Sequence, residues 1–118
     1  MDQALQHFID LGYIKNSEII YDAYREVNIC FLENNGHLIE LVQPSSNNSV
    51  VGKFIKKVGI SPYHICYITE SMDKACVELA EKGYIMTAKP EVAPALDGKK
   101  VAFFYHKHVG LIEIMEES

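Results

Sequence analysis

The stretch Leu38-Ile39-Glu40-Leu41 recurs at an offset of 73 residues as Leu111-Ile112-Glu113-Ile114. The match extends upstream at slightly different offsets. An offset of 71 superposes Asp2, Ala4, Gly12, Tyr13 and Ile14 on Asp73, Ala75, Gly83, Tyr84 and Ile85, and an offset of 74 superposes Val27, Ile29 and Phe31 on Val101, Phe103 and Tyr105. Small differences in loop length between two copies of one unit explain why the offset changes along the chain. Two copies are too few for a solenoid, so the sequence predicts a pseudo-symmetric pair of modules.

Each module is predicted to contain a helix followed by three strands. The first helix runs from about Leu5 to Gly12, and the second begins after Ser71 and ends at Gly83. Serine favours helix starts, and glycine favours the left-handed conformation that ends helices. The Asn34-Asn35-Gly36 turn indicates a hairpin. The expected strands lie around 19–21, 27–31 and 38–42 in the first module, and around 84–86, 101–105 and 111–115 in the second.

The second module carries one more strand, Tyr63 to Ile68, ahead of its helix. The counterpart in the first module would precede Met1. The expected fold is therefore α+β, with two paired βαβββ modules of which the first lacks its opening strand. We expect a single domain over residues 1–118, divided into module one at 1–44, a connector at 45–61 and module two at 62–118. A sheet edge without its covering strand favours a homodimer or a shortened form of a longer protein.

The composition is that of an ordinary globular protein. Its 118 residues include 11 Lys and Arg against 16 Asp and Glu, for a net charge of −5, and 48% of them are hydrophobic. The acidic balance and the lack of a basic cluster argue against nucleic-acid and membrane partners. The apolar runs are also too short to cross a bilayer. Cys30, Cys66 and Cys76 form no C-x-x-C pair, which favours buried thiols in a reducing cytosol and predicts a cytoplasmic protein.

Three polar residues stand in apolar strands. Glu40 and Glu113 occupy matched positions among aliphatic residues, and His64 is the second residue of its strand. A carboxylate in such surroundings must be solvated in a cavity, paired or bound to a cation, because burying it alone costs free energy. Two glutamates at repeat-equivalent positions favour a shared site. The alternative is that both are carboxylates at the rim of a sheet and that His64 is a hydrogen-bonded core histidine.

Three stretches of the chain are distinctive: His37-Leu38-Ile39-Glu40-Leu41-Val42-Gln43-Pro44, Asn48-Ser49-Val50-Val51-Gly52-Lys53-Phe54 and Tyr63-His64-Ile65-Cys66. These stretches resemble the methylmalonyl-CoA epimerases of the vicinal-oxygen-chelate superfamily, which also includes glyoxalase I. Residues 100–107 and 110–114 are similar to the closing hairpin of that family. The resemblance covers nearly the whole chain, and it implies curled sheets that enclose a metal cavity.

The resemblance implies that Glu40, His64 and Glu113 hold a divalent metal ion (Co, Zn, Ni or Mn) at three of the family's four ligand positions. The fourth ligand, a histidine on the opening strand, would precede Met1. Such a metal acts as a Lewis acid on the enolate that forms when a proton α to a carbonyl is removed. The glutamate base of the epimerases aligns with Tyr24. Asp22 lies two residues earlier on the same strand face and Glu26 two residues later, and Asp22 is the candidate catalytic base. The alternative is that Asp22 is a solvated turn residue.

The function expected from this resemblance is that of a metal-dependent isomerase or lyase similar to methylmalonyl-CoA epimerase. It would abstract a proton α to a thioester or ketone carbonyl through a metal-bound enolate, and its partner would be a small-molecule substrate such as an acyl-thioester. Two alternatives are a glyoxalase I-like lactoylglutathione lyase and a metal-free small-molecule-binding protein of the same fold. The segment from Ala88 to Gly98 is expected to be a loop at the rim of the substrate site.

Overall fold

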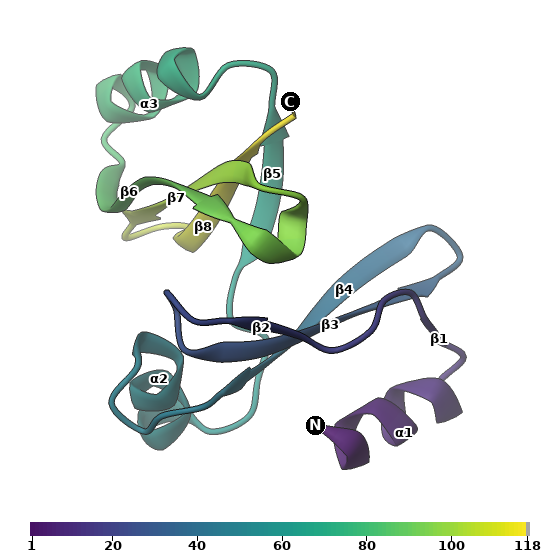
Figure 1. Ribbon diagram of the computed structural model, residues 1–118. Helices are drawn as coiled ribbons and strands as arrows, with labels where there is room; N and C mark the ends of the chain where they lie inside the picture. The colour runs from purple at the N-terminus through teal and green to yellow at the C-terminus, as the bar shows by residue number, and fades with distance from the viewer. Residues whose placement is uncertain (118) are drawn as a thin grey trace. The chain divides into compact units, whose positions relative to one another are not determined.

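The computed structural model describes residues 1–117, which divide into two compact units, Met1–Ile60 and a second unit that begins at Ser61. The first unit contains α1 (Asp2–Asp10), β1 (Ile14–Lys15), β2 (Ile20–Asp22), β3 (Val27–Asn34), β4 (His37–Pro44) and α2 (Val50–Val58). The second contains β5 (Ile65–Thr69), α3 (Met72–Glu81), β6 (Ile85–Ala93), the 3-10 turn η1 (Pro94–Leu96), β7 (Lys99–His106) and β8 (Gly110–Glu116) (Figure 1). None of these helices is long and apolar enough to span a membrane.

The first unit is a four-stranded antiparallel sheet with α1 packed on one face. Both β1 and β2 pair with one side of β3, and β4 pairs with its other side. The core between α1 and the sheet contains Leu5, Cys30 and Leu32, with Ile39 and Leu41 of β4 packed against them. Because side chains alternate along a strand, the residues between these positions face away from α1.

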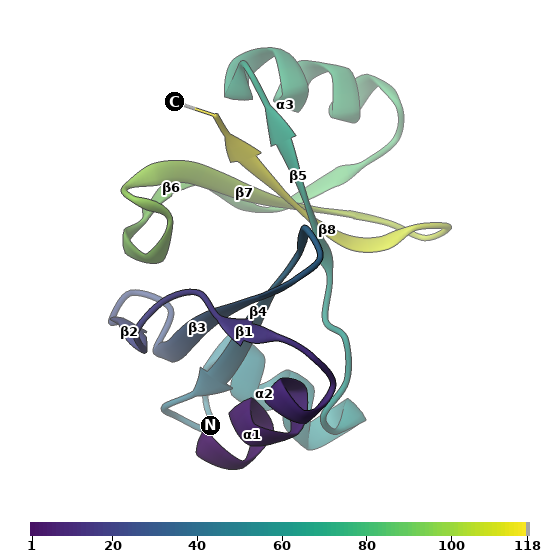
Figure 2. The same ribbon diagram turned by 90° about the vertical axis from the view of Figure 1, so that its right-hand side faces the viewer.

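The second unit is a sheet in the order β5-β8-β7-β6, with α3 on one face (Figure 1 and Figure 2). The strand β5 runs parallel to β8, and the other two pairs are antiparallel. The core under α3 consists of the buried residues Met72, Ala102, Phe104, Ile112 and Ile114. A parallel neighbour requires a long connection between strands, which α3, β6 and β7 provide here.

The predicted two-module α+β fold is confirmed. Helix and strands follow one another in the same order in both units, and Gly12 and Gly83 after the first helix of each unit have φ values of 100° and 91°. Within residues 1–117, a strand precedes the first helix in the second unit alone. Consequently β8 pairs on both sides, whereas β4 pairs only with β3 within residues 1–117.

Cross-strand pairing corrects the predicted alignment of the two modules. Glu40 pairs with Phe31 and Glu113 pairs with Phe103. Phe31 therefore corresponds to Phe103 at an offset of 72, and the predicted match of Phe31 to Tyr105 at 74 is wrong. The offset rises steadily along the chain from 71 through 72 to 73. A slip of two residues leaves every side chain on its own face, so apolar alternation does not reveal it.

The loop predicted for residues 88–98 is also wrong over its first half, because β6 continues to Ala93. The strand is irregular, with register shifts between Met86 and Ala88 and between Ala88 and Glu91. Pro90 lies in the second of these shifts. It is tolerated because β6 is an edge strand, where a residue without an N–H group breaks no ladder on the outer side.

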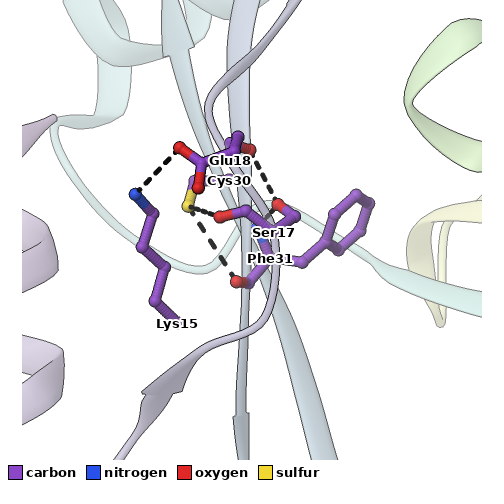
Figure 3. A network of polar contacts seen from close by, with 5 residues as sticks. All are labelled: Lys15, Ser17, Glu18, Cys30 and Phe31. Atoms are coloured by element: carbon purple, nitrogen blue, oxygen red, sulfur yellow. Dashed lines mark hydrogen bonds and ion pairs between the residues drawn. The ribbon is translucent and has the colours of Figure 1, made fainter.

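The gap between β1 and β2 is closed by a polar network around Phe31 and Cys30 (Figure 3). The Ser17 hydroxyl accepts a hydrogen bond from the N–H group of Phe31 at 3.0 Å, and the Asn16 N–H group donates to the Phe31 carbonyl at 2.8 Å. The Cys30 thiol donates to the carbonyl of Ser17 at 3.5 Å. These bonds replace the missing strand ladder and hold the backbone of β3 where Phe31 faces Glu40.

The cysteines bear out the expectation of buried thiols only in part. All three are thiols, and Cys30 is fully buried in the first core. Cys76 is partly buried against the second core. Cys66 is exposed, so the prediction is wrong for that residue. It lies on β5, which has no second neighbouring strand within residues 1–117 and is exposed along most of its length.

A tightly packed turn leads from β4 into α2 of the first unit. The Ser49 hydroxyl accepts a hydrogen bond from the N–H group of Gly52 and donates one to the Ser46 carbonyl, as expected for a residue that caps a helix. A Cβ atom on Gly52 would collide with the Ser46 carbonyl oxygen and lie 3.0 Å from backbone atoms of Asn47. The close approach of these two backbones therefore requires glycine.

We predict that Gly52→Ala destabilises the protein by about 1–3 kcal/mol, because overpacking against backbone outweighs the helix propensity of alanine, which favours the variant by about 1 kcal/mol. Chemical unfolding in urea measures this change. Lys53→Ala, at an exposed position of the same helix, is the control and should change the free energy of unfolding by less than about 0.5 kcal/mol. A Gly52→Ala protein as stable as the wild type would contradict the prediction.

Candidate metal and proton-transfer site

Glu113 lies in the middle of β8 with its side chain on the sheet face away from α3. Its neighbours Ile112 and Ile114 point into the core under α3, so alternation turns Glu113 the other way. It is paired with Phe103 of β7 on one side and with Cys66 of β5 on the other. The Glu113 side chain is 9% exposed.

The buried Glu113 carboxylate meets the imidazole of His64, which directly precedes β5. The distance from His64 Nε2 to Glu113 Oε1 is 2.8 Å. The His64 side chain is 15% exposed, and within residues 1–117 its buried Nδ1 atom has no hydrogen-bond partner. The contact is a neutral hydrogen bond or an ion pair according to the protonation of His64. In both cases it supplies the partner that a buried carboxylate requires.

Two aromatic rings enclose the imidazole of His64. The ring of Phe103 is 5.2 Å away at an interplanar angle of 86°, and the ring of Tyr63 is 4.8 Å away at 62°. Burial also raises the pKa of the Tyr63 phenol above its usual value. Sequence reasoning did not single out either aromatic residue. Alternation along β7, combined with the hairpin pairing, would have placed Phe103 beside Glu113.

Glu40 has the same strand setting in the first unit. It lies on β4 opposite Phe31, on the face away from α1, because Ile39 and Leu41 on either side pack toward the first core. The structural equivalence of Glu40 and Glu113 is thereby established. Their surroundings differ, since Glu40 is exposed and no histidine corresponds to His64 in the first unit.

Asp22 lies at the end of β2 on the same sheet face as Glu40. It pairs with Val27, which alternates with Ile29 and Phe31 along β3. Its side chain is 2% exposed, so the alternative of a solvated residue is wrong.

Both carboxylate oxygens of Asp22 are engaged by Arg25 in the turn that follows. Oδ1 accepts from the backbone N–H group of Arg25 at 3.0 Å, and Oδ2 accepts from Arg25 Nη1 at 2.9 Å. The Arg25 guanidinium lies 5.4 Å from the centre of the Tyr24 ring. These contacts organise the turn between β2 and β3. A carboxylate has about four lone-pair sites, so two hydrogen bonds leave capacity to accept a proton, and the assignment of Asp22 as base stays a prediction.

The donor set of the second unit fits two positions of a divalent metal site. Two N or O ligands bound at about 2.1 Å and at right angles lie about 3 Å apart, close to the separation of His64 Nε2 and Glu113 Oε1. Imidazole and carboxylate together suit first-row divalent metals. Within residues 1–117 no three His, Cys, Asp or Glu side chains form a group that could hold a metal ion. Glu40 belongs to the first unit, so its role as a third ligand stays a prediction.

Solved structures with the same fold include both uncharacterised and enzymatic proteins. A hypothetical protein from Bacillus halodurans is 28% identical, with a TM-score of 0.86 over 100% of this chain and 86% of that chain. Methylmalonyl-CoA epimerase from Mycobacterium tuberculosis is 23% identical, with a TM-score of 0.85 over 99% and 80%. A Streptomyces coelicolor methylmalonyl-CoA epimerase variant in complex with 2-nitronate-propionyl-CoA is 20% identical, with a TM-score of 0.86 over 100% and 87%.

No functionally curated protein matches the chain significantly. The epimerase structures establish the fold alone, because their identities lie below 25%. A family model matches most of the chain and therefore identifies the superfamily. The match of residues 1–103 to that model shows that the chain belongs to the glyoxalase/bleomycin resistance protein/dioxygenase superfamily.

Proposed function

We propose that the protein is a metal-dependent isomerase or lyase, similar to methylmalonyl-CoA epimerase, that removes a proton α to the carbonyl of an acyl thioester. The buried pair of His64 and Glu113 carries this proposal, because it brings an imidazole nitrogen and a carboxylate oxygen to 2.8 Å in the fold that the epimerases share. One fold neighbour is described in complex with a CoA derivative. This supports a thioester as the substrate class.

Each residue has a role under this proposal. His64 and Glu113 would hold a divalent ion such as Co, Zn, Ni or Mn, and Glu40 would supply a further carboxylate. When bound, the metal would act as a Lewis acid that stabilises negative charge on the substrate carbonyl oxygen. Asp22 would accept the α-proton, since it lies on the same sheet face as Glu40 and retains unused lone pairs.

Metal content separates this proposal from the metal-free binding protein. We expect protein purified without added metal to retain a divalent ion, and Glu113→Ala to lower the affinity for that ion by more than about 100-fold, the upper range for losing a residue that only supports a ligand. Elemental analysis and cobalt titration measure both quantities. Glu117→Ala, an exposed carboxylate near the same strand, should leave the affinity unchanged. Wild-type protein without affinity for any of the four metals would refute metal dependence.

Glu40→Ala tests the contribution of the first unit to the same ion. A ligand in the first unit predicts a loss of metal affinity comparable to that of Glu113→Ala, and thermal unfolding of the metal-free protein reports whether the variant is folded. Cobalt titration and thermal unfolding are the measurements. An affinity equal to that of the wild type would exclude Glu40 from the site and leave His64 and Glu113 as the only assigned ligands.

Solvent exchange tests the assignment of Asp22. Incubation of acyl-CoA thioesters with the protein in D2O should introduce deuterium at the α-carbon, and Asp22→Asn should slow this exchange by about 10²–10⁴-fold while metal stays bound. Asp22→Asn also breaks the ion pair with Arg25, so Arg25→Gln is the matched control. It removes the same ion pair but keeps the carboxylate, and should slow exchange by less than about 10-fold.

Equal losses in the two variants would show that Asp22 acts only through the turn. Unchanged exchange in Asp22→Asn would transfer the role of base to Glu26 or Tyr24. If exchange is absent from the wild type but a hemithioacetal of glutathione is converted, the protein is a glyoxalase I-like lyase.

A further inference from the structure

The orientation of the His64 imidazole is not held by hydrogen bonds at both ring nitrogens. Nε2 meets Glu113, but Nδ1 is buried and without a partner in the described part of the chain. Histidines that bind metals usually donate their second ring N–H group to a carboxylate, a carbonyl or a water, and this bond fixes the direction of the ring. The other described contacts of the imidazole are those with the rings of Tyr63 and Phe103.

Phe103 provides a contact of the required kind. Its ring meets that of His64 at 5.2 Å and nearly at a right angle, an arrangement that aromatic pairs favour. Phe103 is also the cross-strand partner of Glu113, so one side chain adjoins both members of the pair. It belongs to the central strand β7, which pairs with β6 and β8. Tyr63 covers His64 too, but it precedes β5 and lies outside any strand.

We infer that Phe103 is a positioning residue for His64. Its ring takes the place of the second hydrogen bond and keeps the imidazole in the orientation that directs Nε2 toward Glu113. Because this inference concerns the direction of a metal ligand, its consequence for affinity rests on the proposed function. The orientation itself is a property of the metal-free chain and can be measured without any metal.

The chain offers controls on the same strand. Phe103→Leu removes the aromatic contact but keeps an apolar side chain of similar bulk, and Phe103→Tyr keeps the ring. Tyr105→Leu changes an aromatic residue on the same sheet face, two positions along, that pairs with Leu111 and is 45% exposed. A general effect of altering β7 would appear in both leucine variants, whereas a positioning effect would appear only in Phe103→Leu.

The first readout is the ¹H–¹⁵N spectrum of the imidazole side chains in metal-free protein, with His64 assigned by its loss in His64→Gln. Wild type, Phe103→Tyr and Tyr105→Leu should show one fixed tautomer of His64, and Phe103→Leu should show averaged ring nitrogens. The second readout is cobalt affinity, which we expect to fall about 3- to 10-fold in Phe103→Leu only. This corresponds to the usual value of an aromatic pair. Thermal unfolding reports whether each variant folds.

A fixed tautomer and unchanged cobalt affinity in Phe103→Leu would overturn the inference, as would equal changes in Tyr105→Leu. If Phe103→Leu does not fold, averaged ring nitrogens in folded Phe103→Tyr would overturn it, and a fixed tautomer there would support it. Failure of the wild type to bind cobalt would refute the proposed function instead. The spectrum of the metal-free protein would then still decide whether Phe103 orients His64.

Discussion

Burial of the Glu113 carboxylate is the constraint on which the rest of the candidate site depends. The core under α3 requires Ile112 and Ile114 to face the helix, so Glu113 must face the other way. Its side chain is buried on that face, and a buried charge without a partner is costly. The strand β5 meets both needs, since it covers the edge of β8 and carries His64 at its start. The same segment therefore completes the pairing of β8 and supplies the partner of the buried carboxylate.

Much of this arrangement follows from the sequence. The repeated Leu-Ile-Glu pattern places one glutamate in each module, and apolar alternation puts both on the face away from the helix. The Asn-Gly turn, the Ser71 cap, Gly12 and Gly83 indicate the boundaries, and these features are confirmed. His64 stands out because it is a polar residue in an apolar run, and the structure places it directly before β5 rather than as the second residue of that strand. The contact between His64 and Glu113 follows once the first and last strands of a βαβββ module are paired in parallel.

The remaining features depend on geometry that sequence patterns do not contain. A two-residue slip between β3 and β7 preserves alternation, so the equivalence of Phe31 and Phe103 became visible only through their pairing with Glu40 and Glu113. Whether His64 Nδ1 has a hydrogen-bond partner depends on which atoms lie around the ring, and sequence patterns do not specify them. Whether Asp22 is solvated depends on the turn that folds Arg25 back onto it, and nothing in the spacing of the two residues decides that.

The cross-strand Phe–Glu pair occurs in both units, but its surroundings differ between them. Glu113 is flanked by two strands and satisfied by an imidazole, whereas Glu40 lies on a strand that pairs on one side within residues 1–117 and is exposed. Neither carboxylate therefore requires a cation for its own unit to fold. Under the proposed function, the metal would be a ligand of an already folded chain. Its binding would add stability by mass action, without being a condition for folding.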